Sequence, residues 1–154
     1  MNFSGEIHVP APPEILFDRL RDAQFFASCV EGVGELTEIA PDQYTAKLTT
    51  RIAYIRFEFE ISVILTRAER PTVIEARIEG KPHGVVGRLS ANSAAHFQAE
   101  GSGTKVRYQI DANLTGRLGS IGQPVLKSKA KEMERQFVEK LRTAFPGTQS
   151  EAAA

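Results

Sequence analysis

The sequence predicts an α+β fold, in which a curved antiparallel sheet of seven strands wraps around a long C-terminal helix. In the middle of the chain, apolar and polar residues alternate with period two, which is typical of strands with one buried face. Near the C-terminus the period changes to between three and four, which is typical of one amphipathic helix. That helix must lay its apolar stripe on the sheet, because neither surface is stable alone in water.

The chain is expected to begin with one strand and two short helices. The strand is expected at residues 2–9, where apolar residues alternate with polar ones. A cluster of prolines then stops the strand, and Pro13 suits the first turn of a short helix. Asp22 suits the N-cap of a second short helix, which we expect to end near Cys29.

Six further strands are expected in a meander after the short helices. The clearest of them contains Phe57 and Phe59, which share one face with other apolar residues while charged residues occupy the opposite face. The loops between the strands are too short for parallel crossovers, so the sheet should be antiparallel. The six strands are expected at residues 35–39, 44–52, 55–65, 73–79, 89–99 and 106–114.

The closing helix is expected from Leu118 to Phe145. Together with the elements before it, this helix completes a single domain, residues 1–146. Residues 147–154 form a small polar segment that we expect to be a flexible tail. The apolar stripe of the helix consists of Leu118, Ile121, Val125, Leu126, Met133, Phe137, Leu141 and Phe145.

Composition and charge restrict the function classes. The 154 residues carry 19 basic and 19 acidic side chains, and this balance argues against a dedicated nucleic-acid-binding protein. Because Cys29 is the single cysteine, no internal disulfide can form, which fits a reducing compartment. The sequence shows neither a signal peptide nor a membrane-spanning stretch, so we expect a cytoplasmic protein.

The order of elements, together with local motifs, resembles a known family. The predicted order is similar to the helix-grip (SRPBCC) superfamily, which includes START lipid-transfer domains, polyketide cyclases and plant pathogenesis-related proteins. Within that superfamily the chain resembles the G-subunit family of carbon monoxide dehydrogenase over nearly its whole length. The matching motifs are residues 3–7 with 9–12, Cys29 with Gly32 and Leu36, residues 101–108 and residues 111–122.

The chain departs from the family pattern at two places. Members usually carry a proline two residues after the cysteine, where this chain has Glu31. A glycine-rich segment before the sixth strand is reduced here to Gly80, Gly84 and Gly87. Both departures fall at the expected mouth of a cavity. The resemblance implies an accessory role beside a molybdenum-containing hydroxylase, membrane recruitment, and binding of a lipophilic molecule such as a quinone.

A cavity between the sheet and the helix is the expected binding site. The inward-facing strand positions pair large residues with small ones, and small residues on a concave sheet leave volume for an apolar ligand. The alternative is that aromatic side chains fill this space completely. The expected lining consists of Phe17, Leu20, Phe57, Phe59, Ala91, Ala95, Phe97, Tyr108, Ile121, Val125 and Met133.

Three glycines near the start of the long helix suggest a gate for this cavity. Gly116, Gly119 and Gly122 weaken the first turns, because a glycine inside a helix costs about 1 kcal/mol relative to alanine. The alternative is that this segment is mostly loop, with Ser120 and Gln123 forming a capping box at the helix start.

Basic and aromatic side chains suggest a surface for an anionic membrane or an acidic partner. The alternative is a solvated helix face, because acidic residues follow closely along the helix. One of the two phenylalanines of the second short helix should face the core, and the other could enter a membrane interface. The expected surface consists of Phe25, Phe26, Arg117, Lys127, Lys129 and Lys131.

Catalytic, metal-binding and cofactor-binding residues are not expected. The three histidines lie on separate elements without zinc-ligand spacing, and only His83 lies on a loop that could border the cavity. The strand carboxylates alternate outward, and Cys29 is more typical of a buried core residue than of a nucleophile. The favoured hypothesis is therefore a non-enzymatic carrier of a lipophilic molecule. The alternatives are a cyclase- or aromatase-like enzyme of the same fold and an assembly factor that acts through its surface alone.

Overall fold

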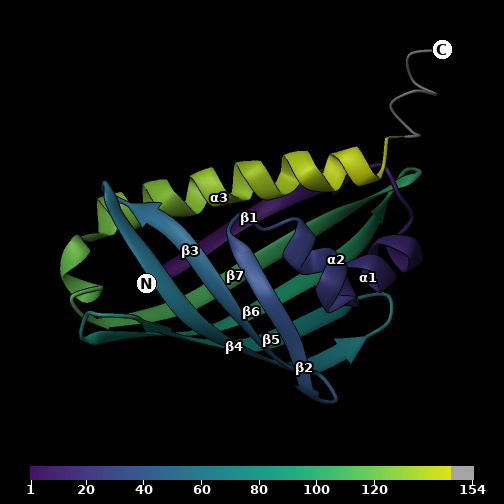
Figure 1. Cartoon of the computed structure of the whole chain (residues 1–154). Coiled ribbons are helices and arrows are strands. Elements are labelled where there is room, and N and C mark those ends of the chain that lie inside the picture. The colour runs from purple at the N-terminus through teal and green to yellow at the C-terminus, as the bar shows by residue number, and fades with distance from the viewer. Residues whose placement is uncertain (147–154) are drawn as a thin grey trace.

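The computed structural model describes residues 1–146, so the predicted tail at 147–154 lies outside the described residues. Figure 1 shows a curved sheet with one long helix on its concave side, which confirms the α+β prediction. The elements are β1 (Asn2–Val9), α1 (Pro13–Arg21), α2 (Ala23–Ser28), β2 (Val33–Ala40), β3 (Gln43–Ile52), β4 (Ile55–Glu69), β5 (Val73–Pro82), β6 (Gly87–Glu100), β7 (Gly103–Gly116), the short 3-10 helix η1 (Gly119–Ile121) and α3 (Gln123–Ala144).

The sheet has seven antiparallel strands in the order β1-β7-β6-β5-β4-β3-β2. Strands β2 to β7 form the predicted meander, and β1 returns to pair with β7, with Ile7 opposite Val106. Short turns connect the meander, as expected for antiparallel neighbours. The register places the small residues Ala76, Ser93 and Ala112 on the same concave face as the aromatic residues of β4.

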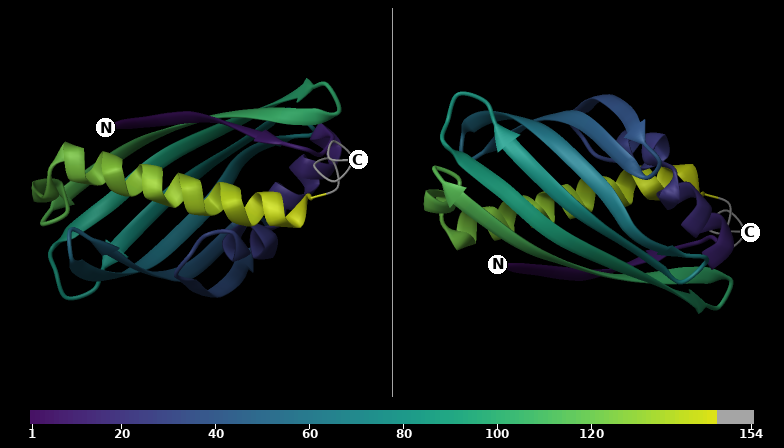
Figure 2. Two further views of the ribbon diagram at one scale, coloured as in Figure 1. Left: turned by 90° about the horizontal axis from the view of Figure 1, so that it is seen from above. Right: turned by 90° about the horizontal axis from the view of Figure 1, so that it is seen from below.

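The long helix begins at Gln123 rather than at the expected Leu118. Gly122, with φ of 100°, separates η1 from α3, and Pro124 occupies the first turn of α3. The expected capping box is absent, because the Ser120 hydroxyl donates to the Arg117 carbonyl oxygen at 2.8 Å. Figure 2 shows α3 lying lengthwise across the concave face, with β1 along one side of it and β3 along the other.

Two separate hydrophobic cores attach the helix to the rest of the molecule. The first core joins β1, α1 and β7 to the C-terminal part of α3, where Leu141 is buried. Its rings include Phe17 and Phe97, which meet edge to face at 5.5 Å. The second core lies at the start of α3, where Leu126 packs beside the stacked rings of Phe57 and Phe59, 5.8 Å apart.

Between the two cores the concave face is only partly covered. Its floor consists of small side chains, because Ala76, Ala91, Ser93 and Ala112 occupy the centre of β5, β6 and β7. Apolar residues around this floor belong to neither core and remain half-buried, although they face the helix. They are Val63, Ile78 and Ile110. These three side chains therefore keep part of their surface exposed beneath α3, whereas the alanines of the floor are buried.

Candidate functional site

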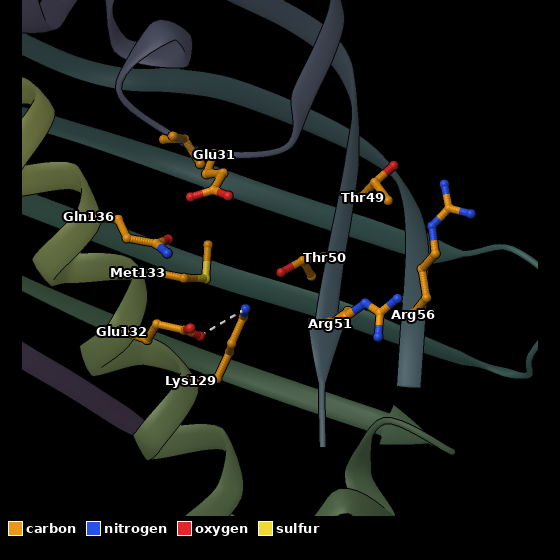
Figure 3. A pocket seen from close by; sticks show the side chains of 10 residues that line it. Glu31, Thr49, Thr50, Arg51, Arg56, Lys129, Glu132, Met133 and Gln136 are labelled. Carbon is orange, nitrogen blue, oxygen red and sulfur yellow. Dashed lines mark hydrogen bonds and ion pairs between the residues drawn. The ribbon is translucent and has the colours of Figure 1, made fainter. Parts of the chain in front are cut away.

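A pocket of about 510 Å³ opens where α3 passes the end of β3. Figure 3 shows its lining side chains converging from the helix on one side and from the sheet on the other. The α2–β2 loop closes its third side. The pocket is lined by Val30, Glu31, Thr49, Thr50, Arg51, Arg56, Lys129, Glu132, Met133 and Gln136.

The pocket opens here because β2 stops pairing with β3 before β3 ends. With two shifts in register, β2 pairs with β3 as far as Val33 opposite Leu48, and one further contact follows, in which the Thr49 amide donates to the Gly32 carbonyl oxygen at 3.0 Å. Beyond that point β3 pairs with β4 alone and forms the edge of the sheet, with Thr50 on its concave face, opposite Phe57. The chain turns at Gly32, where φ is 89° and a Cβ would clash with the Thr49 backbone.

Charged groups surround the mouth of the pocket. The Lys129 ammonium lies 3.0 Å from a Glu132 carboxylate oxygen, and the Lys129 side chain is only 17% exposed. Arg56 is paired with Glu58 at 3.5 Å. Glu31, which stands where the resembled family usually has proline, has no ion-pair partner within residues 1–146. The lining of the pocket is thus mostly polar, with Val30 and Met133 as its apolar members.

On the opposite side of α3, a side-chain pair connects the helix to the sheet. The Tyr108 hydroxyl of β7 donates to the Glu134 carboxylate of α3. Gly5 of β1 leaves room for this pair, because a Cβ there would lie 2.5 Å from a Glu134 oxygen and 2.9 Å from the Tyr108 ring. The gap beneath the helix is therefore bridged on the β1 side and open on the β3 side.

The expected cavity residues do not form one continuous wall. Phe17, Leu20, Ala95, Phe97 and Tyr108 belong to the first core or pack against it, whereas Phe57, Phe59 and Ile121 do so for the second. Ala91 lies on the floor between the cores. Of the expected cavity residues, only Met133 is among those that line the pocket of Figure 3.

One expected wall residue lies elsewhere. Val125 is 37% exposed and belongs neither to the two cores nor to the lining of the pocket beside β3. The reason is the late start of α3, which makes Leu126 the first inward-facing residue of the helix.

Close packing explains two of the three glycines of the expected gate. Gly116, with φ of 62°, ends β7 where a Cβ would clash with the Val86 carbonyl. A Cβ at Gly119 would lie 2.7 Å from the Leu114 carbonyl oxygen. No atom lies within 4 Å of a Cβ at Gly122, so close packing does not explain this residue, whereas its φ of 100° favours glycine.

The expected surface residues separate into distinct groups. Phe25 packs against the first core beneath the Arg19 guanidinium, whereas Phe26 is 45% exposed. Arg117, Lys127 and Lys131 are exposed near the start of α3. Lys129 is not part of this surface, because it lies in the pocket.

The acidic residues expected to neutralise the helix surface point elsewhere. Glu132 pairs with Lys129, and Glu134 accepts from Tyr108, so both face the interior side of α3. Exposed charges on the outer side of α3 are therefore mostly basic. They are Lys127, Lys131, Arg135, Lys140 and Arg142, with Glu139 as the acidic exception.

His83, the histidine on a loop that could border the cavity, does not line the pocket beside β3. Its imidazole lies 3.5 Å from Glu60, whose side chain alternates to the outer face of β4, and Tyr54 is 98% exposed at a hairpin tip. Burial raises the pKa of the Cys29 thiol, which disfavours the nucleophilic thiolate. Within residues 1–146, no three His, Cys, Asp or Glu side chains gather closely enough to hold a metal ion.

Comparison with known families decides the relationship. The family model of the carbon monoxide dehydrogenase G subunit (CoxG) matches residues 5–145. The chain belongs to this family. Its membership confirms the resemblance seen in the sequence, and the match covers every strand and helix that forms the pocket.

Solved structures agree with the helix-grip fold. A conserved protein from Geobacillus kaustophilus is 22% identical, with a TM-score of 0.87 over 96% of this chain and 97% of that one. A START superfamily protein from Mycobacterium smegmatis is 13% identical, with a TM-score of 0.67 over 96% and 98%. A protein from Thermus thermophilus is 16% identical, with a TM-score of 0.64 over 94% and 99%. At these identities the likeness establishes the fold alone.

Two further findings complete the comparison. No curated protein matches the CoxG-family chain with significant similarity. In the described part of the chain, none of the helices combines the length and the apolar character needed to cross a bilayer.

Proposed function

We propose that this CoxG-family protein is a non-enzymatic carrier that holds a small lipophilic molecule between the sheet and α3. The observation that carries the proposal is the interval between the two cores, meaning the part of the concave face where Val63, Ile78 and Ile110 belong to neither core and remain half-buried. An apolar molecule in this interval would remove their surface from water, and each Å² so buried contributes about 25 cal/mol.

The entrance to this interval is the pocket beside β3. Its volume of about 510 Å³ falls within the range of small-molecule sites, which is about 300–1,000 Å³. The molecule would enter past Thr50 and Met133 and extend over the small residues of the floor. Opening would be aided by Gly122, acting as a hinge at the start of α3.

A quinone is the ligand that we favour. Family membership suggests a role beside carbon monoxide dehydrogenase or a similar molybdenum-containing oxidoreductase, to which the protein would carry the quinone. A quinone also combines an apolar ring and tail with polar carbonyl oxygens, which suits an apolar floor behind a polar entrance. We place the protein in the cytoplasm, with peripheral contact to the inner face of the cell membrane, where such a ligand resides.

Direct titration tests the carrier function. We expect the lipophilic dye Nile red to bind saturably, with one dye per chain, because the structure offers one interval between its two cores. Decylubiquinone should then displace the dye competitively, as followed by the loss of dye fluorescence. Linear, non-saturable dye uptake would contradict the carrier function, and saturable dye binding without displacement would exclude the quinone.

Membrane contact is expected to depend on the basic side of α3. Reversing two charges with Lys127→Glu and Lys131→Glu should weaken binding to vesicles that contain phosphatidylserine by about tenfold or more, because each basic residue near an anionic surface contributes about 1 kcal/mol. Vesicle co-sedimentation at low salt measures the effect.

The control carries the same change of net charge on the outer face of the sheet. Lys81→Glu combined with Arg88→Glu alters two exposed residues of β5 and β6 that point away from the concave face, and it should leave vesicle binding nearly unchanged. Equal losses in both double variants would show that total charge, and not the α3 surface, governs binding.

A further inference from the structure

One cationic side chain of α3 is largely shielded from solvent. Lys127 and Lys131 are exposed, but Lys129, between them, has a side chain only 17% exposed and lines the pocket. Figure 3 shows its ammonium pointing into the space between the helix and β3, on the same side as Met133 and Gln136.

The ammonium of Lys129 is only partly satisfied. It donates to Glu132 at 3.0 Å and has no other hydrogen-bond partner within residues 1–146. A lysine ammonium has three donors, so two of them remain available on the pocket side. Glu132 is more exposed, at 43%, and holds the ammonium in place from the next turn of the helix.

Partial burial of the ammonium costs free energy, which the ion pair with Glu132 offsets. Removing a charged group from water is unfavourable, and a surface position two residues away on the same helix would avoid that cost. An apolar residue at position 129 would extend the stripe that Leu126 and Met133 begin. The charge therefore does not improve the packing of α3 on the sheet.

We propose that Lys129, positioned by Glu132, donates hydrogen bonds to an acceptor oxygen at the polar end of the bound molecule. This inference rests on the proposed carrier function and specifies its ligand class. The ligand is an amphipathic molecule with a carboxylate or a ketone-type carbonyl at one end. That end stays at the entrance, and the apolar remainder extends over Ser93 and its small neighbours.

Three probes of similar chain length distinguish a carboxylate from a neutral carbonyl as the group that accepts from Lys129. Lauric acid carries a carboxylate, methyl undecyl ketone carries a neutral carbonyl, and tridecane carries no oxygen. Their affinities are measured by Nile red displacement for the wild type, Lys129→Met, Lys129→Arg and Lys131→Met. The last variant is the matched control, because it makes the same change on the exposed side of the helix.

We expect Lys129→Met to weaken lauric acid by about ten- to a hundredfold and the ketone by about three- to tenfold, because hydrogen bonds between charged partners are the stronger ones. Tridecane affinity should not fall in this variant. Lys129→Arg should restore much of the binding, and Lys131→Met should match the wild type. A loss confined to the acid or to the ketone identifies that group as the acceptor and supports the inference.

A second variant keeps the inference testable if Lys129→Met folds poorly. Glu132→Gln removes the counter-charge but keeps an acceptor for the ammonium, so lauric acid should bind several-fold more tightly and the ketone about equally. Unchanged acid affinity in Glu132→Gln, or equal losses for all three probes in Lys129→Met, would overturn the role of Lys129. If none of the probes displaces the dye from the wild type, the carrier function itself fails.

Discussion

Replacing Ser93 with phenylalanine is expected to weaken binding of any lipophilic ligand by about a hundredfold or more, a change of roughly 3 kcal/mol in binding free energy, while the fold remains intact. Ser93 lies at the centre of the floor, on the concave face of β6 opposite Ala76. A phenyl ring there would take the volume that the apolar part of the ligand needs.

The stability of the same variant reports whether the interval is empty. In a closely packed core, adding such a ring costs about 1–3 kcal/mol, because neighbours are forced from their rotamers. If the space is open, the ring should fit at little cost, since the Ser93 hydroxyl makes only a long contact of 3.5 Å with the Ala76 carbonyl oxygen. Urea unfolding followed by circular dichroism measures the difference.

Ala94→Phe is the matched control for this prediction. Ala94 is the next residue of β6 and points to the opposite face, so the same ring is added outside the interval. Dye binding should therefore be retained. Loss of binding in both variants, or retention in both, would show that the floor of β6 does not form the site.

Replacing Leu141 with alanine is expected to lower the free energy of unfolding by about 2–5 kcal/mol. Leu141 is 1% exposed and connects the last turns of α3 to the first core, which includes Phe17 and Val106. Its removal leaves a cavity at the main attachment of the helix. The neighbouring Arg142→Ala changes an exposed side chain and should alter stability by no more than about 0.5 kcal/mol.

Leu141→Ala also tests whether the attachment of α3 to the first core is independent of ligand binding. The first core lies beside the interval and not within it, so the folded variant should bind dye as the wild type does under conditions that keep it folded. A stability loss as small as that of Arg142→Ala would mean that the first core does not hold α3. A large loss of dye affinity in the folded protein would mean that the two functions are coupled.

The sheet could be predicted from the sequence because its signal is local. Alternation of apolar and polar residues depends only on which face each residue of a strand occupies, and it locates every strand of the meander. The start of α3 could not be located in the same way. Leu118 and Ile121 continue the apolar spacing, but they belong to the segment before Gly122 and not to the helix.

The composition of the site is harder to predict. The four phenylalanines expected in the cavity wall pair with each other, Phe57 with Phe59 and Phe17 with Phe97, and they belong to the two cores. Which aromatic rings meet depends on tertiary packing, which alternation does not encode. The small residues at the centre, such as Ala91, can be recognised because their size is visible in the sequence.

The polar entrance could not be predicted from charge alone, although helical spacing in the sequence indicates it. The charge of Lys129 favours the surface, yet this residue lies four residues before Met133, and Gln136 lies three residues after Met133. Residues at these spacings share one side of a helix, so helical phase places all three together. Glu134 could not be paired with Tyr108 in advance, because the contact depends on the space left by Gly5.

Organic extraction of freshly purified protein, followed by mass spectrometry, tests the central claim most directly. We expect about one lipophilic molecule per chain from the wild type and from Ala94→Phe, and almost none from Ser93→Phe, because only the last variant fills the interval. The mass of the extracted species would also show whether it carries the acceptor oxygen expected beside Lys129. An extract from cells supplied with lipid that contains no such species, or equal amounts from all three proteins, would contradict the carrier function.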